Sequence, residues 1–408
     1  MPHVVVIGGG IIGAACADAL TRRGASVTLV ERDELAAGAS GRNQGLWVPP
    51  EDPVLHQIAA RSLARYLEIA DEAPLPIRID ALPIGTVFVA VDEESIGAAM
   101  DTLAAVSTGG FAVEELDDAA LAEAEPELAH DLAATWFIDA GHRLDPAALT
   151  VALALLAASR GAVIRHHLSA RALIADGDRV TGVVTDEGKI EADEVVVAAG
   201  PWSARLLEPL GISLPVLGVR GWLVRVAPGK RLVRHLVRTA EPSGPVGAVR
   251  AGDIARMGFP PSDGYGSIVH PHDDGTALIG SSRAAWLTPE PEDPSVPQRL
   301  LTSAIRIVPR LADALMLSSW WGLRPMTPDE RPVIGRLRDG LVVATGHGSE
   351  GVINGAGTAE LVAAVVFDEP PPFDAAPFDP FRFTFNRFVG KRIDDILMRS
   401  NRHDVIIF

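Results

Sequence analysis

The stretch Val4-Val5-Val6-Ile7-Gly8-Gly9-Gly10-Ile11-Ile12-Gly13 decides the fold expected for this chain of 408 residues. Its first four residues are β-branched and apolar, which is typical of a strand buried on both faces of a parallel sheet. The spacing Gly8-x-Gly10-x-x-Gly13 follows directly, and helically spaced apolar residues continue to Gly24. Such glycines permit a tight turn, close approach of the backbone to a pyrophosphate, and close packing of helix on strand.

A second strand is expected at residues 26–30, and it ends at Glu31, 18 residues beyond Gly13. A carboxylate at this point can accept hydrogen bonds from both hydroxyls of a ribose. The N–H groups at the start of the intervening helix would face the phosphates. Strand, glycines, helix, strand and acid in this order predict a dinucleotide site; the alternative is a glycine-rich turn without a ligand.

The composition limits the class of protein. Hydrophobic residues make up 48% of the chain and charged residues 22%, which suits a large core. Lys+Arg 36 against Asp+Glu 53 gives a net charge of −17, so nucleic acid and anionic membranes are not expected partners. The single cysteine, Cys16, allows no intrachain disulfide and no thiolate metal cluster. We see no signal peptide and no apolar run of the roughly 18 residues that span a bilayer, and we expect a cytoplasmic protein.

Two further buried strands are expected at 193–198 and 341–346, so the chain returns twice to the parallel sheet. The fold class predicted is α/β, with a Rossmann-like domain interleaved with a strand-rich α+β substrate domain. The nucleotide domain would comprise residues 1–50, 145–215 and 320–368. The substrate domain would comprise residues 51–144 and 216–319. Residues 369–408 would form a C-terminal tail, amphipathic from residue 383, which is compatible with a homo-oligomer.

Other candidate sites are weaker. His270 and His272 share a strand face, but they lie at a hairpin turn, and no metal site is expected there. His166 and His167 would point to opposite faces of a strand at 163–167 and could not bind one ion. The segment 346–351 lacks the first glycine of a GxSxG motif, which argues against a serine hydrolase.

Four stretches together resemble the D-amino acid oxidase (DAO) family of FAD-dependent oxidoreductases, in its group of glycine oxidase, sarcosine oxidase and D-amino acid dehydrogenase. They are the N-terminal glycine motif with Glu31, the loop Ser40-Gly41-Arg42-Asn43-Gln44-Gly45, the strand and turn Val195 to Trp202, and Gly322 to Asp329 with Gly346-His347-Gly348. The resemblance covers about residues 3–382 and favours FAD over NAD.

The resemblance implies a set of residues that line the FAD site. Gly346 to Gly351 would direct N–H groups at the flavin pyrimidine. No histidine lies in the loop 38–46 and Cys16 is wrongly placed, so the FAD would be non-covalent. The expected cofactor-binding residues are Gly8, Gly10, Ile11, Ile12, Gly13, Glu31, Arg32, Ser40, Arg42, Asn43, Gln44, Gly45, Ala170, Ala199, Gly200, Trp202, Gly346, Gly348, Ser349, Gly351 and Val352.

Arg324 is the residue expected to bind the substrate. Its guanidinium can hold a carboxylate through two parallel N–H groups and so orient the Cα–H toward flavin N5. The alternative is a structural ion pair with Asp329 or Glu330. The sequence also differs from glycine oxidase at two positions. Ser267 stands where glycine oxidase has a tyrosine, and Ser349 stands where it has a second arginine. The candidate catalytic residues are Arg324, His347, Tyr265 and Ser349.

These residues predict oxidation of the C–N bond of an amino acid or secondary amine. Hydride transfer to flavin N5 would leave an imine that hydrolyses, with O2 or a quinone or protein as electron acceptor. One alternative is an FAD dehydrogenase of a hydroxy acid, which needs a base such as His347 or His270. Another is the flavin-bearing subunit of a heteromeric dehydrogenase. The substrate, its stereochemistry and the acceptor stay open.

Overall fold

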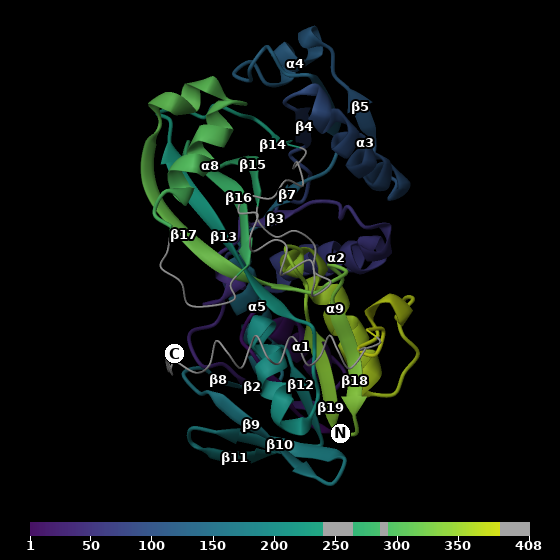
Figure 1. Ribbon diagram of the computed structural model, residues 1–408. Coiled ribbons are helices and arrows are strands. Elements are labelled where there is room, and N and C mark those ends of the chain that lie inside the picture. Colours follow the sequence, from purple (N-terminus) through teal and green to yellow (C-terminus); the bar gives the residue numbers. More distant parts are fainter. Residues whose placement is uncertain (240–263, 286–292, 384–408) are drawn as a thin grey trace.

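The computed structural model describes residues 1–239, 264–285 and 293–383. These residues form two large sheets, one of six strands and one of eight, together with two small sheets. The six-stranded sheet lies in the lower half of Figure 1 and the eight-stranded sheet in the upper half. The predicted class, α/β with a Rossmann-like part and a second strand-rich part, is confirmed.

The six-stranded sheet has the order β18-β19-β12-β1-β2-β8. Strand β1 pairs in parallel with both β2 and β12, and β12 pairs in parallel with β19. Val4, Val5 and Val6 are fully buried, as expected for a strand covered on both faces. The bounds are β1 His3–Ile7, β2 Ser26–Val30, β8 Val163–Arg165, β12 Glu194–Val197, β18 Val333–Arg338 and β19 Leu341–Thr345.

Four helices are associated with this sheet: α1 (Ile11–Arg22), α2 (His56–Glu72), α5 (Pro146–Ser159) and α9 (Gly351–Val366). Helix α1 packs against α5 and α9, and α2 packs against α9. Gly357 permits this close approach, since a Cβ there would overlap the carbonyl oxygen of Ile58. The Tyr66 hydroxyl donates to the carbonyl oxygen of Val352 at 2.8 Å. Helix α2 therefore supports the first turn of α9.

The eight-stranded sheet has the order β17-β13-β16-β15-β14-β4-β6-β5. Helix α8 (Val296–Ile305) packs against β13, β15 and β16. Helix α8 is followed by a separate 3-10 turn, Pro309–Asp313. The strand bounds are β4 Thr86–Ala90, β5 Val113–Glu115, β6 Ala134–Ile138, β13 Leu217–Ala227, β14 Leu236–Thr239, β15 Gly264–Pro271, β16 Ala277–Ala285 and β17 Leu315–Met326.

The remaining elements are short or peripheral. Asp145 caps α5, since its side chain accepts the N–H of Ala148 at 2.9 Å. The other helices are α3 Glu93–Thr108, α4 Asp118–Ala124 and α6 Ser203–Leu207. The two small sheets consist of β9 Ala170–Asp176, β10 Arg179–Thr185 and β11 Gly188–Glu191, and of β3 Leu46–Trp47 and β7 His142–Arg143.

The domain boundaries stay a prediction, and two elements pack with a different part of the molecule from the one predicted. Helix α2, placed in the substrate domain by the sequence, packs on the helices of the Rossmann-like part. Strand β17 runs across residue 320 and belongs over its whole length to the eight-stranded sheet. The amphipathic segment 384–408 lies outside the described residues. Among the helices of the described ranges, none is both long and apolar enough to cross a membrane.

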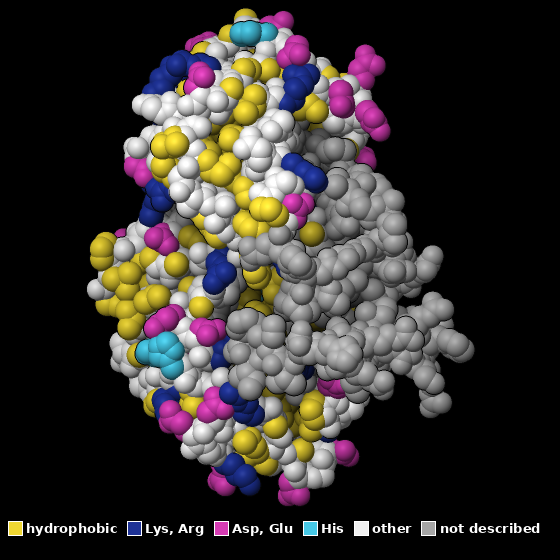
Figure 2. Space-filling model, turned by 60° about the vertical axis from the view of Figure 1, so that its left-hand side comes forward, with side chains coloured by type: hydrophobic (Ala, Val, Ile, Leu, Met, Phe, Trp, Pro, Cys, Tyr) yellow, Lys and Arg dark blue, Asp and Glu magenta, His cyan; other side chains and the backbone are white. Residues whose placement is uncertain are grey.

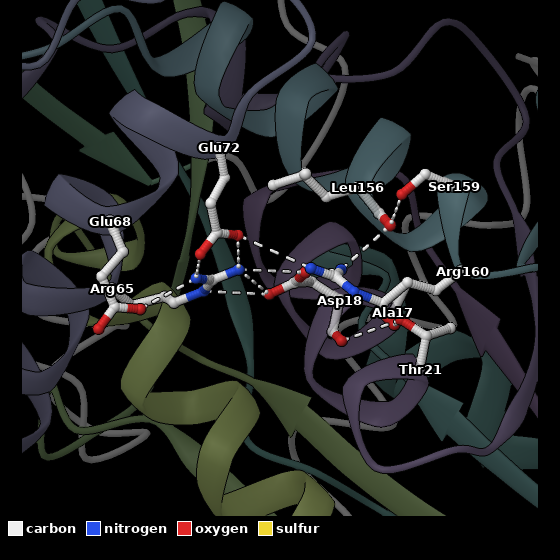
Figure 3. A network of polar contacts seen from close by, with 9 residues as sticks. All are labelled: Ala17, Asp18, Thr21, Arg65, Glu68, Glu72, Leu156, Ser159 and Arg160. Carbon is white, nitrogen blue, oxygen red and sulfur yellow. Dashed lines mark hydrogen bonds and ion pairs between the residues drawn. The ribbon is translucent and has the colours of Figure 1, made fainter.

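A buried ionic network joins α1, α2 and α5 (Figure 3). Asp18 lies inside α1 with only 3% of its side chain exposed, and its carboxylate contacts Arg65 at 3.1 Å and Arg160 at 2.7 Å. Arg65, whose side chain is 6% exposed, also contacts Glu68 and Glu72. Burial alone would lower the pKa of Arg65, but its hydrogen bond to Glu72 and the charge of Asp18 raise it. The guanidinium therefore stays charged and links α2 to α1, while Arg160, directly after α5, joins that helix to the same carboxylate.

Candidate active site

A cavity of about 1180 Å³ lies between the two large sheets and is lined from both. Its walls include the carboxyl ends of β1, β2 and β12, where open α/β sheets bind ligands. Strands β13 and β17 form the opposite wall through Gly221 and Arg324. On the described part of the face in Figure 2, acidic and basic side chains are interspersed. The net negative charge of the chain is therefore not gathered into one patch on that part of the surface.

Glu31 is held rigidly at one end of this cavity. Its Oε2 accepts the N–H of Gly9 at 2.5 Å, and its Oε1 accepts the N–H of Asp33 at 2.9 Å. Next to it, the guanidinium of Arg32 stacks over the ring of Trp202, with Cζ 4.0 Å from the ring centroid. These side chains and Ala170 line the cavity. The carboxylate of Glu31, which is predicted to bind a ribose, thus lies in the wall of the cavity where a nucleotide would bind.

The start of α1 forms the next part of the wall. Ser40 Oγ accepts the N–H of Ile11 at 2.8 Å, which joins the loop 39–45 to the helix N-terminus. Gly8 has φ +114°, and a Cβ there would overlap the carbonyl oxygen of Ala198. A Cβ on Gly13 would overlap the carbonyl oxygen of Gly8. The backbone can make this turn only with glycine at these positions.

The start of α9 lies on the same cavity, so that two helix N-termini face it. Gly348, at φ +54°, lies in the turn before α9, and its N–H donates to the carbonyl oxygen of Pro325 at 2.8 Å. Gly351 and Val352 form the first turn of the helix. Helix N-termini attract anionic groups, as expected for a pyrophosphate at α1 and a flavin pyrimidine at α9.

Most of the predicted site residues line the cavity, three glycines pack against protein atoms, and the side chain of one residue is not described. Gly13, Gly45 and Gly346 pack against protein atoms, since a Cβ on them would meet Gly8, Leu144 and Thr327 respectively. Tyr265 lies on β15, but its side chain is outside the described part of the chain. The predicted residues that line the cavity are Gly8, Gly10, Ile11, Ile12, Glu31, Arg32, Ser40, Arg42, Asn43, Gln44, Ala170, Ala199, Gly200, Trp202, Arg324, His347, Gly348, Ser349, Gly351 and Val352.

Both histidines considered as bases are buried and hydrogen-bonded to protein. His347 Nε2 lies 2.9 Å from Thr358 Oγ1 on α9, and burial lowers the pKa of His347 to about 3. His270 Nδ1 lies 2.8 Å from the carbonyl oxygen of Gln44, and burial lowers its pKa to about 3. Both rings are therefore neutral near pH 7. Through these hydrogen bonds they hold α9 and the loop 39–45.

Arg324 lies on β17 with its guanidinium against β13. Its Nη1 donates to the carbonyl oxygen of Ser282 at 2.9 Å. Gly221 leaves room for it, because a Cβ at that position would overlap Nη1. The two acids considered as structural partners contact other arginines: Asp329 contacts Arg382 and Glu330 contacts Arg283. The guanidinium is thus braced by the sheet and lines the cavity.

Sequence reasoning missed several charged residues of the cavity. Arg238, Arg283, Asp52 and Glu350 also line it. Arg238 is brought there by the pairing of β14 with β4 and β15, which local sequence does not reveal. Glu350 lies within the turn Gly346 to Gly351, which the sequence already placed at the cofactor. A carboxyl group among the glycines of that turn could have identified Glu350 as a candidate site residue.

The prediction for His166 and His167 is wrong. Strand β8 ends at Arg165, and His167 has φ +56°, so the two rings do not alternate as strand side chains. His166 Nδ1 lies 3.5 Å and His167 Nε2 2.9 Å from the carboxylate oxygens of Glu34. All three side chains are largely exposed, and they form a surface group beyond the cavity.

Fold and cavity define a dinucleotide-binding α/β protein whose second sheet forms the other wall of the cavity. The family described as FAD dependent oxidoreductase (DAO) matches residues 3–365. The chain belongs to this family and is an FAD-dependent oxidoreductase. Two helix N-termini, glycines that exclude a Cβ and a fixed carboxylate all fit FAD.

Three of the similar proteins have names that refer to amino acids. A glycine oxidase of Pseudomonas aeruginosa is 29% identical, and the match covers 93% of this chain and 98% of that protein. A D-amino acid dehydrogenase of Cereibacter sphaeroides is 28% identical, covering 92% and 94% respectively. The crystal structure of glycine oxidase from Geobacillus kaustophilus matches with a TM-score of 0.80 and 27% identity, covering 94% of this chain and 100% of that one.

Glu31→Ala is expected to weaken FAD binding at least about tenfold, because hydrogen bonds to a charged group contribute about 1.5–3 kcal/mol each. The measurement is the dissociation constant of FAD from apoprotein, with circular dichroism to show that the fold is intact. Glu34→Ala, which removes a nearby exposed carboxylate, should leave the constant unchanged. Equal affinities in Glu31→Ala and the parent protein would remove Glu31 from the ribose site.

Proposed function

We propose that this protein oxidises the C–N bond of an amino acid or of a secondary amine that carries a carboxylate. The observation that carries the proposal is Arg324, a guanidinium held against β13 and β16 in the cavity wall, beside the turn that leads into α9. A fixed guanidinium suits bidentate binding of a carboxylate. The amino acid oxidase and dehydrogenase named among the similar proteins support the same substrate class.

Bound FAD supplies the acceptor for a hydride from the carbon that bears the nitrogen. The protein's contribution is orientation: Arg324 holds the carboxylate, and the turn before α9, with Gly348 and Ser349, forms the wall beside it. Fixing the substrate in this way lowers the entropic part of the barrier. The imine product hydrolyses to an oxo acid or aldehyde, and O2, a quinone or a protein takes the electrons.

Oxidation of a hydroxy acid is the less well supported alternative, because the glycine oxidase and the D-amino acid dehydrogenase among the similar proteins are named for amino acids, and the two histidines considered as its base are both engaged with protein. His347 and His270 are neutral, but each is buried and already hydrogen-bonded to protein. The decisive experiment is anaerobic addition of matched amino acids, secondary amines and hydroxy acids to the yellow protein, with flavin absorbance as the readout. We expect bleaching by an amine with a carboxylate; bleaching by hydroxy acids alone would overturn the proposal.

The FAD is expected to be bound without a covalent link. Cys16, the single cysteine of the sequence, is fully buried inside α1, and burial raises the pKa of its thiol to about 12. Its thiolate is therefore not available to react with a flavin. Acid precipitation should leave the yellow colour in the supernatant. Colour that stays with the precipitated protein would show a covalent bond.

A further inference from the structure

Glu350 is a carboxyl group in the wall of the cavity, near the segment that carries Arg324. It lies in the turn between β19 and α9, directly before the first residue of α9, and it lines the cavity. The same turn is joined to β17, because Gly348 donates its N–H to the carbonyl oxygen of Pro325. Pro325 follows Arg324 in the sequence. The backbone thus holds a carboxyl group and the proposed carboxylate-binding arginine on adjoining segments of one cavity.

The partner of Glu350 distinguishes it from the neighbouring acids. Its Oε2 accepts a hydrogen bond from Asn354 Nδ2 at 3.2 Å, and in the described part of the chain it forms no ion pair. The charged groups that face it are Arg238, Asp52 and Glu330. Each of these is paired elsewhere: Arg238 with Glu51, Asp52 with Arg331 and Glu330 with Arg283. The cavity therefore contains one carboxyl group whose described partner is a neutral amide.

Amine oxidation by hydride transfer needs the nitrogen lone pair, whereas an α-amino group is largely protonated at neutral pH. We propose that Glu350 accepts the proton of the substrate's ammonium group before the C–H bond breaks. The N–H bond breaks with its electron pair left on nitrogen, and an O–H bond forms on the carboxylate of Glu350. The proton then leaves through the cavity to solvent. This inference rests on the proposed function and adds a catalytic residue to it.

The ionisation of Glu350 suits this task. Desolvation raises the pKa of Glu350 to about 7, while Asn354 and Arg238 act in the opposite direction. Above this pH Glu350 is ionised and can accept a proton; below it, Glu350 is protonated and cannot. We therefore expect kcat/KM to fall as the pH is lowered through about 7.

The test is the pH profile of kcat/KM for the best substrate in Glu350→Gln. Loss of a proton acceptor should lower the rate at about pH 7.5 by at least about 100-fold, with recovery toward the pKa of the free substrate amine. Glu360→Gln on α9, where Glu360 pairs with Arg61, is the matched control and should keep the parent profile. A Glu350→Gln profile that superimposes on the parent profile would falsify the proposal.

A second variant leaves Glu350 in place. Asn354→Ala removes a hydrogen bond that lowers the pKa of Glu350, so the acidic limb of the profile should move to higher pH while the plateau is retained. An unmoved or downward-shifted limb contradicts the proposal even if Glu350→Gln does not fold. In that case the acidic limb of the kcat/KM profile would report the titration of a group other than Glu350.

Binding gives a readout that does not depend on turnover. The probes are 2-aminoisobutyrate, which has no Cα–H to oxidise, and isobutyrate, which lacks the amine. At about pH 8, where Glu350 is ionised, Glu350→Gln should bind the amino acid at least about tenfold more weakly and isobutyrate as the parent does. Equal losses for both ligands would overturn the assignment. If no amine bleaches the flavin, the proposed function itself fails, which is distinct from a failure at Glu350.

Discussion

Arg324→Lys is expected to lower kcat/KM by about 30- to 1000-fold, equivalent to roughly 2–4 kcal/mol of transition-state binding. Lysine keeps the positive charge but loses the planar pair of N–H groups that fits a carboxylate. Gly221 makes room for a guanidinium against β13, and the ammonium of lysine does not fill that space or reproduce its contact with the carbonyl of Ser282. The measurement is steady-state kinetics on the best substrate of the anaerobic panel.

The variant should also lose its preference for an amino acid over the amine made by removing its carboxylate. FAD content should match the parent, because Arg324 is assigned to the substrate. Arg225→Lys is a suitable control, since Arg225 lies on β13 and pairs with the exposed Asp274. Undiminished discrimination between acid and amine would reassign Arg324 to structure and direct attention to Arg42, which lines the cavity. Arg220 is the other arginine to consider as the carboxylate's partner, and its guanidinium stacks over the ring of Trp321.

Arg65→Ala is expected to lower the free energy of unfolding by about 3–5 kcal/mol, because it leaves the buried carboxylate of Asp18 without its main partner. Arg160 still contacts Asp18, but 30% of its side chain is exposed. The change also removes the ion pair that joins α2 to α1 (Figure 3). Helix α2 packs on α9, so the support of α9 is weakened as well. Urea denaturation at a fixed FAD concentration measures the change, since bound ligand stabilises the folded state.

Glu68→Gln is the matched control for this network. Glu68 contacts the same guanidinium, but 58% of its side chain is exposed, so the change should cost about 0–1 kcal/mol. Similar losses in the two variants would show that burial of the Asp18–Arg65 pair does not govern its contribution. Replacing both Asp18 and Arg65 by apolar residues should cost less than the sum of the single changes, since no charge is then left buried and unpaired.

The Rossmann-like part could be predicted because its signals are local. Strand β1, the glycines and Glu31 lie within one short stretch, and the uniformly apolar strands at β12 and β19 are recognisable wherever they occur. Glycine is required at Gly13 because a Cβ there would overlap the carbonyl oxygen of Gly8, which is near in sequence. It is required at Gly8 because a Cβ there would overlap the carbonyl oxygen of Ala198, directly after β12, the strand that pairs with β1. This information is carried by residue type and spacing, which a linear reading contains.

Residue type and spacing alone were enough to predict the fold class, the glycine motif for FAD and the segments that carry most of the cavity wall. Only the tertiary structure showed that β17 belongs to the eight-stranded sheet, that His166 and His167 share Glu34, and that Asp18 meets Arg65 across 47 residues of sequence. Only it brought Glu350, Arg238 and Arg324 to one cavity. The physical reason is that burial and ion pairing depend on which elements pack together, and pairings between distant segments leave no periodic signal in either segment alone.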